Sequence, residues 1–195
     1  MIKLVCIDLD GTLCSTKELH RSSLAMALSE MNIIIDHTEY EALPTRQKLK
    51  MMCQKGIIEE KNIQRLYDRK QEITLELFKT GDFYLPYVDL ALSKLFHEHT
   101  LACCSNTIRS TLDGILKNTG YNKYFSRTFS NEDVVKCKPD PEMYLKAMWG
   151  FKPDETLIIE DSPVGLEAAY ATGARVMKVD SPKDFYWNNI CRNLT

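Results

Sequence analysis

The sequence lacks the features that mark several classes of protein. It carries 25 basic and 27 acidic side chains, a net charge of −2 that favours neither nucleic acid nor an anionic membrane surface as a partner. No apolar run reaches the ~18 residues of a membrane span, and the N-terminus has no signal-peptide pattern. We therefore expect a cytoplasmic protein, a monomer or weak dimer, that binds neither nucleic acid nor membranes.

The cysteines also form no recognisable pattern. There are seven, an odd number, no Cys-x-x-Cys spacing occurs, and Cys6 and Cys103 lie in apolar runs. Reduced thiols in the core are the expected state. Cys14 is an exception to this expectation. It follows an acidic turn, so a thiol exposed to solvent is the alternative at this position. Gly-x-Gly-x-x-Gly and P-loop motifs are absent as well.

What the sequence does contain is an alternation of short apolar runs with helical segments. Strands are expected at residues 2–7, 100–104, 125–129, 156–159 and 175–179, and helices at 87–97, 110–118, 141–149, 163–172 and from Ser181 onward. This alternation predicts an α/β fold, a Rossmann-like, doubly wound parallel sheet with right-handed crossovers.

A helical block interrupts that alternation directly after the first strand. Residues 16–31, 44–55 and 57–80 have helical spacing, and only 33–35 are strand-like between them. The chain therefore divides into a Rossmann-like core, residues 1–14 and 84–195, and an inserted all-helical cap domain, residues 15–83.

The first strand runs out into two acids, Asp8 and Asp10, followed by Gly11 and Thr12. An Asx-type turn would explain an Asp-Gly pair after a strand. The alternative is an active site, because ligands of open α/β sheets bind beyond the carboxyl ends of the strands. Polar residues after later strands favour the second reading.

Those later residues are expected at the same sheet edge. Ser105 and Asn106 follow the second strand, Glu160 and Asp161 follow the fourth, and Lys138 precedes a helix. Carboxylates gathered in one place repel one another unless a cation neutralises them, and oxygen ligands suit Mg²⁺. A lysine and a hydroxyl can hold phosphoryl oxygens, while a carboxylate can attack phosphorus.

Together these segments resemble the four motifs of the haloacid dehalogenase superfamily, in the right order. The stretch from Ile159 to Ala169 is especially similar to the family's helical-cap branch of phosphatases and β-phosphoglucomutases. The resemblance implies Asp8 as nucleophile and Asp10 as general acid and base. It implies phosphate binding by three further residues and Mg²⁺ ligation by Asp8, the Asp10 carbonyl, Asp161 and Glu160. The three phosphate-binding residues are Ser105, Asn106 and Lys138.

The resemblance also extends to substrate residues of the cap. Thr45 and Arg46 resemble a substrate-binding Ser-Arg pair, and His20 falls where the mutases carry a histidine. Arg46 could pair with a second phosphate or a carboxylate. The alternatives are an exposed arginine at a helix N-terminus and a histidine that packs on the helix surface or at the hinge.

The function implied is a Mg²⁺-dependent phosphatase that acts through an aspartyl-phosphate on Asp8. Its substrate would be a small phosphorylated metabolite, such as a sugar phosphate, a phosphoglycolate-like acid or a nucleotide. A sugar phosphomutase of the β-phosphoglucomutase type is the alternative, although Thr12 and the pair Ala42-Leu43 depart from the mutases. A third, less favoured reading is a phosphate-binding protein of the same fold without turnover.

Overall fold

A computed structural model of the protein describes residues 1–36 and 43–194, which divide into two compact units. In the described part of the chain, one unit comprises residues 1–16 and 82–194, and the other comprises residues 17–36 and 43–81. Ala42, one of the residues in which the chain departs from the mutases, lies outside the described residues. No described helix is both long enough and apolar enough to cross a membrane.

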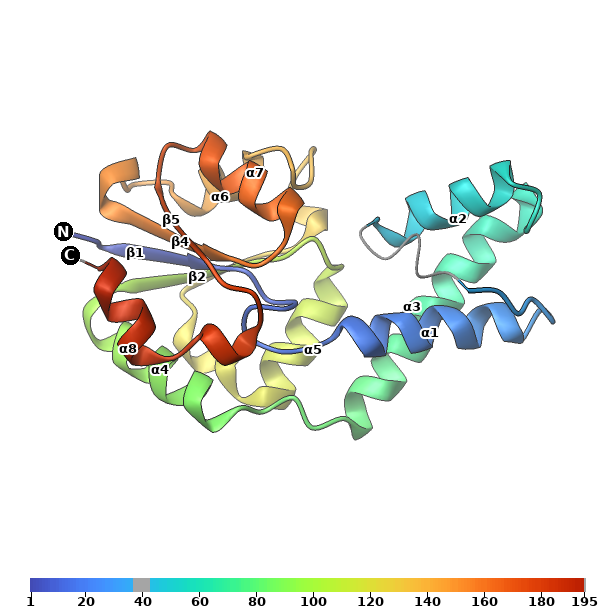
Figure 1. Cartoon of the computed structure of the whole chain (residues 1–195), viewed down its shortest axis with the longest axis horizontal. Helices are drawn as coiled ribbons and strands as arrows, with labels where there is room; N and C mark the ends of the chain where they lie inside the picture. Colours follow the sequence, from blue (N-terminus) through green and yellow to red (C-terminus); the bar gives the residue numbers. More distant parts are fainter. Residues whose placement is uncertain (37–42, 195) are drawn as a thin grey trace. The chain divides into compact units, whose positions relative to one another are not determined.

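The first unit contains a five-stranded sheet whose paired strands all run parallel. The order is β3-β2-β1-β4-β5, so the first strand of the chain lies in the centre of the sheet (Figure 1). The strands are β1 Leu4–Ile7, β2 Thr100–Cys104, β3 Arg127–Phe129, β4 Thr156–Glu160 and β5 Arg175–Lys178.

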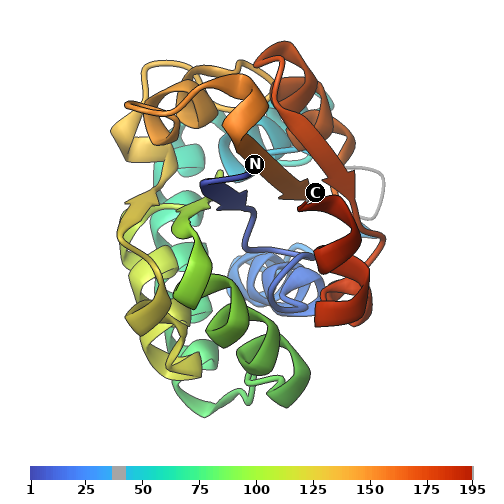
Figure 2. The ribbon, with the colours of Figure 1, turned by 90° about the vertical axis from the view of Figure 1, so that its left-hand side faces the viewer.

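Helices cover both faces of this sheet (Figures 1 and 2). On one face lie α6 (Glu142–Ala147) and α7 (Pro163–Ala171). The other face is covered by α4 Pro86–Glu98, α5 Arg109–Thr119 and α8 Trp187–Ile190. The predicted α/β fold with a doubly wound parallel sheet is therefore confirmed.

The alternation of side chains along the central strands decides which residues face α6 and α7. Leu4 and Cys6 of β1 and Ile158 of β4 join a fully buried cluster with side chains of both helices. Because successive residues of a strand point to opposite faces, Asp8 and Glu160 continue this same face at the carboxyl end. The acidic residues thus emerge on the α6–α7 side of the sheet.

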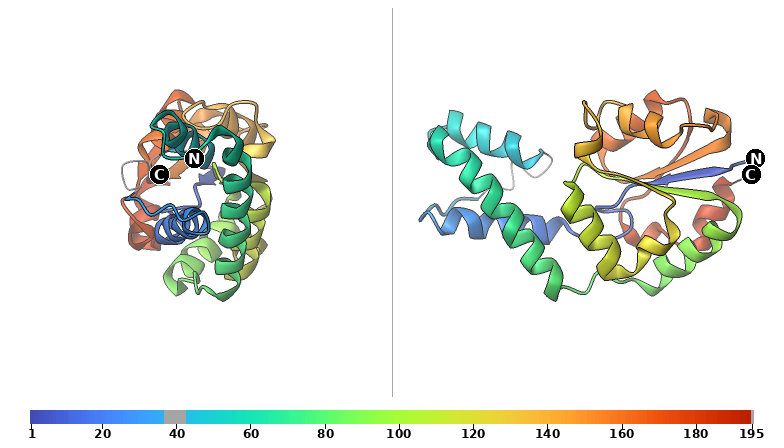
Figure 3. Two further views of the ribbon diagram at one scale, coloured as in Figure 1. Left: turned by 90° about the vertical axis from the view of Figure 1, so that its right-hand side faces the viewer. Right: turned by 180° about the vertical axis from the view of Figure 1, so that it is seen from behind.

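The second unit is a set of helices around its own apolar core, seen from two sides in Figure 3. Helices α1 (Lys17–Ser29) and α2 (Thr45–Gln54) both pack against α3 (Ile63–Thr80). Leucines on all three helices are buried in one cluster: Leu24, Leu28, Leu49 and Leu66. This arrangement confirms that the inserted segment is helical.

Several predicted element boundaries were wrong. The third strand begins at Arg127 rather than at Phe125, the run Ile33–Ile35 forms no strand, and the helix expected from Ser181 is reduced to α8. Short 3₁₀ helices of three or four residues lie between or after the longer elements: Glu60–Asn62, Tyr121–Tyr124, Asn131–Asp133, Pro153–Glu155, Pro182–Asp184 and Cys191–Asn193. Local sequence pattern does not separate such single turns from the ends of longer elements.

Candidate active site

The register of the central strands brings the predicted acidic residues to one level. Ile7 of β1 lies opposite Cys103 of β2 and Ile159 of β4, so the next residue of each strand stands at the carboxyl edge of the sheet. The Asp8 amide still donates to the Ile159 carbonyl at 3.0 Å. Asp8 and Glu160 are thereby held as neighbours by main-chain bonding, before any side-chain contact is considered.

Lys138 joins these acids through its ammonium group. Its Nζ donates to Asp8 Oδ1 at 2.7 Å, to Glu160 Oε2 at 2.8 Å and to the Cys104 carbonyl at 2.8 Å. Burial by itself would lower the pKa of Lys138, but the Asp8 and Glu160 carboxylates raise it above its usual range. The site therefore contains a buried, permanently positive group directly beside Asp8.

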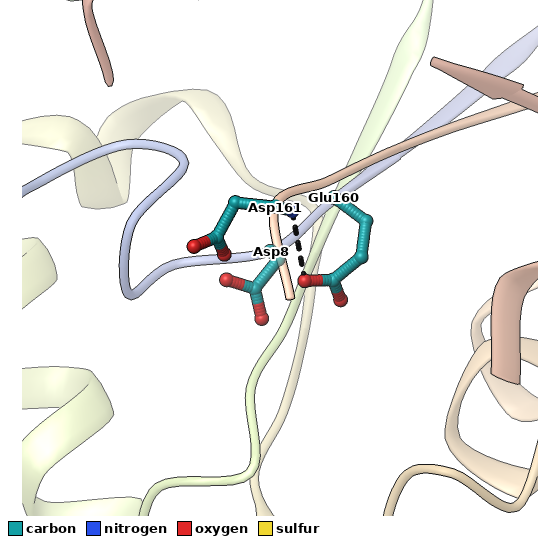
Figure 4. A group of neighbouring side chains, drawn as sticks. All are labelled: Asp8, Glu160 and Asp161. Atoms are coloured by element: carbon teal, nitrogen blue, oxygen red, sulfur yellow. Dashed lines mark hydrogen bonds between the residues drawn. The ribbon is translucent and has the colours of Figure 1, made fainter. Parts of the chain in front are cut away.

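Three carboxylates come close enough together to hold one metal ion. Asp8, Glu160 and Asp161 each offer an oxygen, and these oxygens lie within 4.8 Å of one another (Figure 4). Burial and the negative charge of Glu160 raise the pKa of Asp8 well above its usual range, although Lys138 acts in the opposite direction. One ammonium thus leaves the local negative charge undercompensated, and a hard divalent cation fits this set of oxygen donors.

Glu160 is held by hydrogen bonds at both of its carboxylate oxygens. Its Oε2 accepts hydrogen bonds from Lys138 and from the Tyr144 hydroxyl, the latter at 2.7 Å. Its Oε1 accepts from the Asp161 amide and from the Ser162 amide and hydroxyl, each at 3.0 Å. Burial opposes ionisation, but Lys138 and these donors together keep the pKa of Glu160 below its usual value. The Glu160 carboxylate is therefore a negatively charged group that is held in place by hydrogen bonds beside Lys138.

Asp10 lies on the turn that leaves the first strand. Thr16 donates a hydrogen bond to its Oδ1, and the Ser105 hydroxyl lies 3.4 Å from its Oδ2. Gly11 has a φ of +96°, and a Cβ placed there would lie 2.2 Å from Asp161 Oδ2. A residue without a side chain is therefore needed at this turn, because the backbone passes directly against the Asp161 carboxylate.

Asn106 contacts Lys138 with both ends of its amide. Its Nδ2 donates to the Lys138 carbonyl and its Oδ1 accepts from the Lys138 amide, each at 3.1 Å. The sequence suggested phosphate as its partner. In the structure its side chain holds the main chain of the lysine, and its role toward phosphate stays a prediction.

The predicted substrate residues lie in the helical unit. Thr45 is the first residue of α2, and the guanidinium of the exposed Arg46 stacks 4.0 Å from the centre of the Tyr67 ring. His20 Nδ1 lies 3.0 Å from Nζ of the buried Lys70. Their role toward a substrate stays a prediction.

Three features of this region were not predicted from the sequence. Tyr144 and Gly165 both contact Glu160. Tyr144 lies outside the motif segments and Gly165 lies in the stretch from Ile159 to Ala169 that resembles the family, but neither was predicted to contribute to the site. A tyrosine among the apolar positions of the predicted helix 141–149 was the only signal for the first. Cys14 is fully buried, so the alternative of an exposed thiol is wrong, and all seven cysteines are free.

Comparison with known proteins identifies the family. The sequence model of the haloacid dehalogenase-like hydrolases matches residues 5–179. The chain belongs to this family. Protein CbbY of Rhodobacter capsulatus is 27% identical over 92% of this chain and 86% of that protein. A phosphorylated carbohydrates phosphatase of Thermotoga maritima is 25% identical over 88% of this chain and 82% of that protein.

Solved structures of this family share the fold. β-Phosphoglucomutase from Clostridium difficile superposes with a TM-score of 0.82 at 19% identity, over 100% of this chain and 97% of that one. A variant of CbbY from Rhodobacter sphaeroides, in complex with xylulose-(1,5)bisphosphate, has a TM-score of 0.81 at 21% identity, over 91% and 86%. The haloacid dehalogenase-like assignment made from the motifs is confirmed, and with it the assignment as a phosphate-ester hydrolase.

Proposed function

We propose that this member of the family is a Mg²⁺-dependent phosphatase that acts on a small phosphorylated metabolite through an aspartyl-phosphate on Asp8. One observation carries the proposal: the Lys138 ammonium bonds Asp8 and Glu160 at once, with Asp161 alongside. This arrangement supports the proposal because it brings a carboxylate that can attack phosphorus, a positive charge and oxygen atoms that could hold a metal ion to one sheet edge.

Asp8 is the proposed nucleophile. One of its carboxylate oxygens attacks phosphorus, a new P–O bond forms to Asp8, and the bond from phosphorus to the ester oxygen breaks. Asp10 gives its proton to that departing oxygen. In the second step Asp10 takes a proton from water, which attacks the same phosphorus and restores the Asp8 carboxylate as phosphate leaves. The hydrogen bond from Thr16 and the nearby Ser105 hydroxyl support this role, because they orient the Asp10 carboxylate at the end of the first strand.

Ser105 and Lys138 are the proposed phosphate-binding residues. Both are almost fully buried, and the lysine keeps its charge, so each can offer a donor to phosphoryl oxygens in a place from which bulk water is largely excluded. Asp8, Asp161 and the Asp10 carbonyl would hold Mg²⁺, with Glu160 in support. When bound, the ion would supply the positive charge that a phosphoryl group and three carboxylates require.

For the substrate we propose a phosphorylated sugar. The names of two relatives, a phosphorylated carbohydrates phosphatase and a bisphosphate-bound CbbY, support this class. We also propose that the helical segment, residues 15–83, acts as a cap that supplies Thr45, Arg46 and His20 to the part of the substrate that is not phosphoryl. A sugar phosphomutase remains the second candidate.

The test is a phosphate-release assay on the purified chain with Mg²⁺, using an aryl phosphate and a panel of hexose phosphates, pentose phosphates, phosphoglycolate and nucleotides. Release should be abolished by Asp8→Asn and by a chelator in excess, and Mg²⁺ should restore the chelated enzyme. Asp154→Asn removes an exposed acid outside the site and should leave the rate unchanged. Retained release in Asp8→Asn would exclude it as the nucleophile, and interconversion of two hexose phosphates without release would favour the mutase.

A further inference from the structure

Tyr144 is a buried tyrosine whose hydroxyl and ring both contact residues of the candidate active site. It lies in α6 with none of its surface exposed. Its hydroxyl donates to Glu160 Oε2 at 2.7 Å, and Lys138 Nζ lies 4.7 Å from the centre of its ring. The Tyr144 hydroxyl therefore contacts the Glu160 carboxylate, while the face of its ring contacts the Lys138 ammonium.

The contacts of Glu160 explain why this hydroxyl matters. Oε1 is fixed by donors from its own segment, Asp161 and Ser162, whereas Oε2 has only Lys138 and Tyr144 among the hydrogen bonds given above. The terminal torsion of a glutamate is soft. Without the hydroxyl, Oε2 would keep Lys138 as its one donor among these hydrogen bonds, and the two groups could shift together away from Asp8.

We propose that Tyr144 is a positioning residue for phosphoryl transfer, which fixes Glu160 and through it holds the Lys138 ammonium against Asp8. This inference rests on the proposed function and extends it to a residue outside the four motif segments. In the proposed reaction the Lys138 ammonium stabilises negative charge that develops on the phosphoryl oxygens. A small displacement of this ammonium should therefore weaken stabilisation of the transition state more than binding of the substrate.

The chain contains a matched control in the same unit. Tyr124 donates its hydroxyl to Asp89 Oδ1 at 2.9 Å, and Lys123 Nζ lies 3.5 Å from that carboxylate oxygen and 4.8 Å from the centre of the Tyr124 ring. This tyrosine–carboxylate–lysine group repeats the chemistry of the first one. Lys123 is more than half exposed, however, and none of the three residues belongs to the site.

The experiment compares Tyr144→Phe with Tyr124→Phe in the full chain with Mg²⁺, using the aryl phosphate. Tyr144→Phe should lower kcat about tenfold and change KM less than about twofold, whereas Tyr124→Phe should leave both within about twofold. Thermal denaturation is recorded for both variants, and the comparison is made at a temperature where each is folded. Equal kcat values for the two variants and the unaltered chain would overturn the proposal.

A second measurement does not depend on turnover. Lys138 is probed with acetic anhydride, and the acetylated fraction at each lysine is read by mass spectrometry. Acetylation of Lys138 should rise several-fold in Tyr144→Phe relative to both the unaltered chain and Tyr124→Phe. If the unaltered chain released no phosphate, the proposed function would fail, and this measurement would still decide whether Tyr144 positions the lysine: unchanged reactivity would mean that it does not.

Discussion

Gly165 packs so closely against Glu160 that no side chain fits between them. A Cβ built on Gly165 would lie 1.9 Å from Glu160 Oε2 and 2.0 Å from its carboxyl carbon. The glycine stands in the first turn of α7, where Ser162 caps the helix by accepting a hydrogen bond from the Gly165 amide. The first turn of α7 thereby packs directly against the Glu160 carboxylate, which binds Lys138.

Gly165→Ala should therefore damage the site although alanine favours helices. In an exposed helix the change would add up to about 1 kcal/mol of stability, whereas an extra methyl in a filled core costs about 1–3 kcal/mol. We expect kcat for phosphate release to fall at least about tenfold, because Glu160 must move and Lys138 with it. Val164→Ala, a change at the neighbouring, partly exposed position, serves as the control. A fully active Gly165→Ala variant would show that Glu160 can shift at no cost.

Asn106 should act through the main chain of Lys138. Asn106→Asp keeps an acceptor for the Lys138 amide but loses the donor to the Lys138 carbonyl and puts oxygen against oxygen. We expect a loss of about 1–2 kcal/mol in the free energy of unfolding, together with a lower kcat, measured by urea denaturation and by phosphate release. Asn122→Asp, an exposed change in the same unit, should alter neither. A variant that raised KM alone would favour direct contact with phosphate.

Arg46 provides a test of substrate choice in the helical unit. Its guanidinium is exposed, stacks on Tyr67 and donates to Gln64 Oε1 at 2.9 Å, so two contacts orient it. Arg46→Ala should reduce kcat/KM about tenfold or more for a preferred substrate that carries a second anionic group, the loss of one charge-assisted contact. The rate with a plain aryl phosphate should stay within about twofold.

Arg65→Ala removes another exposed arginine of the same unit and is the control for Arg46→Ala. If both substrates lost activity equally in Arg46→Ala, the residue would not be a determinant of specificity. Equal losses in Arg65→Ala would point to the net charge of the unit instead.

Glu142 should make stability depend on acid pH. Its carboxylate accepts from the Val135 amide, is paired with Lys146 and accepts from the Lys136 amide, and these contacts lower its pKa from 4.5 to about 2. A carboxyl whose pKa is depressed on folding stabilises the folded state above its unfolded value, and that contribution is lost as the pH falls from about 4.5 toward 2.

The measurement is urea unfolding of the unaltered chain and of Glu142→Gln at pH 6 and pH 3. The free energies of unfolding of the two proteins should differ more at pH 6 than at pH 3. At pH 6 the Glu142 carboxylate is charged in both the folded and the unfolded state, whereas at pH 3 it is already protonated in the unfolded chain. Glu132→Gln, an exposed acid on the same connection after β3, is the matched control. A difference that did not change with pH would contradict the assignment.

Local pattern predicted the order of elements and the residues that meet at the sheet edge. Apolar runs followed directly by Asp8, Ser105 and Glu160 were enough, because parallel strands joined by right-handed crossovers must end on one side. Pattern failed where single turns end an element, as at Phe125 and in the last helix.

The sequence by itself therefore determined the fold class and the inserted helical segment, since both follow from periodicity. It also indicated that Asp8, Lys138 and Asp161 lie at one sheet edge, while their catalytic roles rest on the resemblance to the family and stay proposals. Only the tertiary structure decided that Asn106 holds the lysine and that Cys14 is buried. It also decided that Tyr144 and Gly165 close around Glu160. Such contacts join segments distant in the chain, and they depend on which faces of α6 and α7 pack against the sheet, which no local pattern encodes.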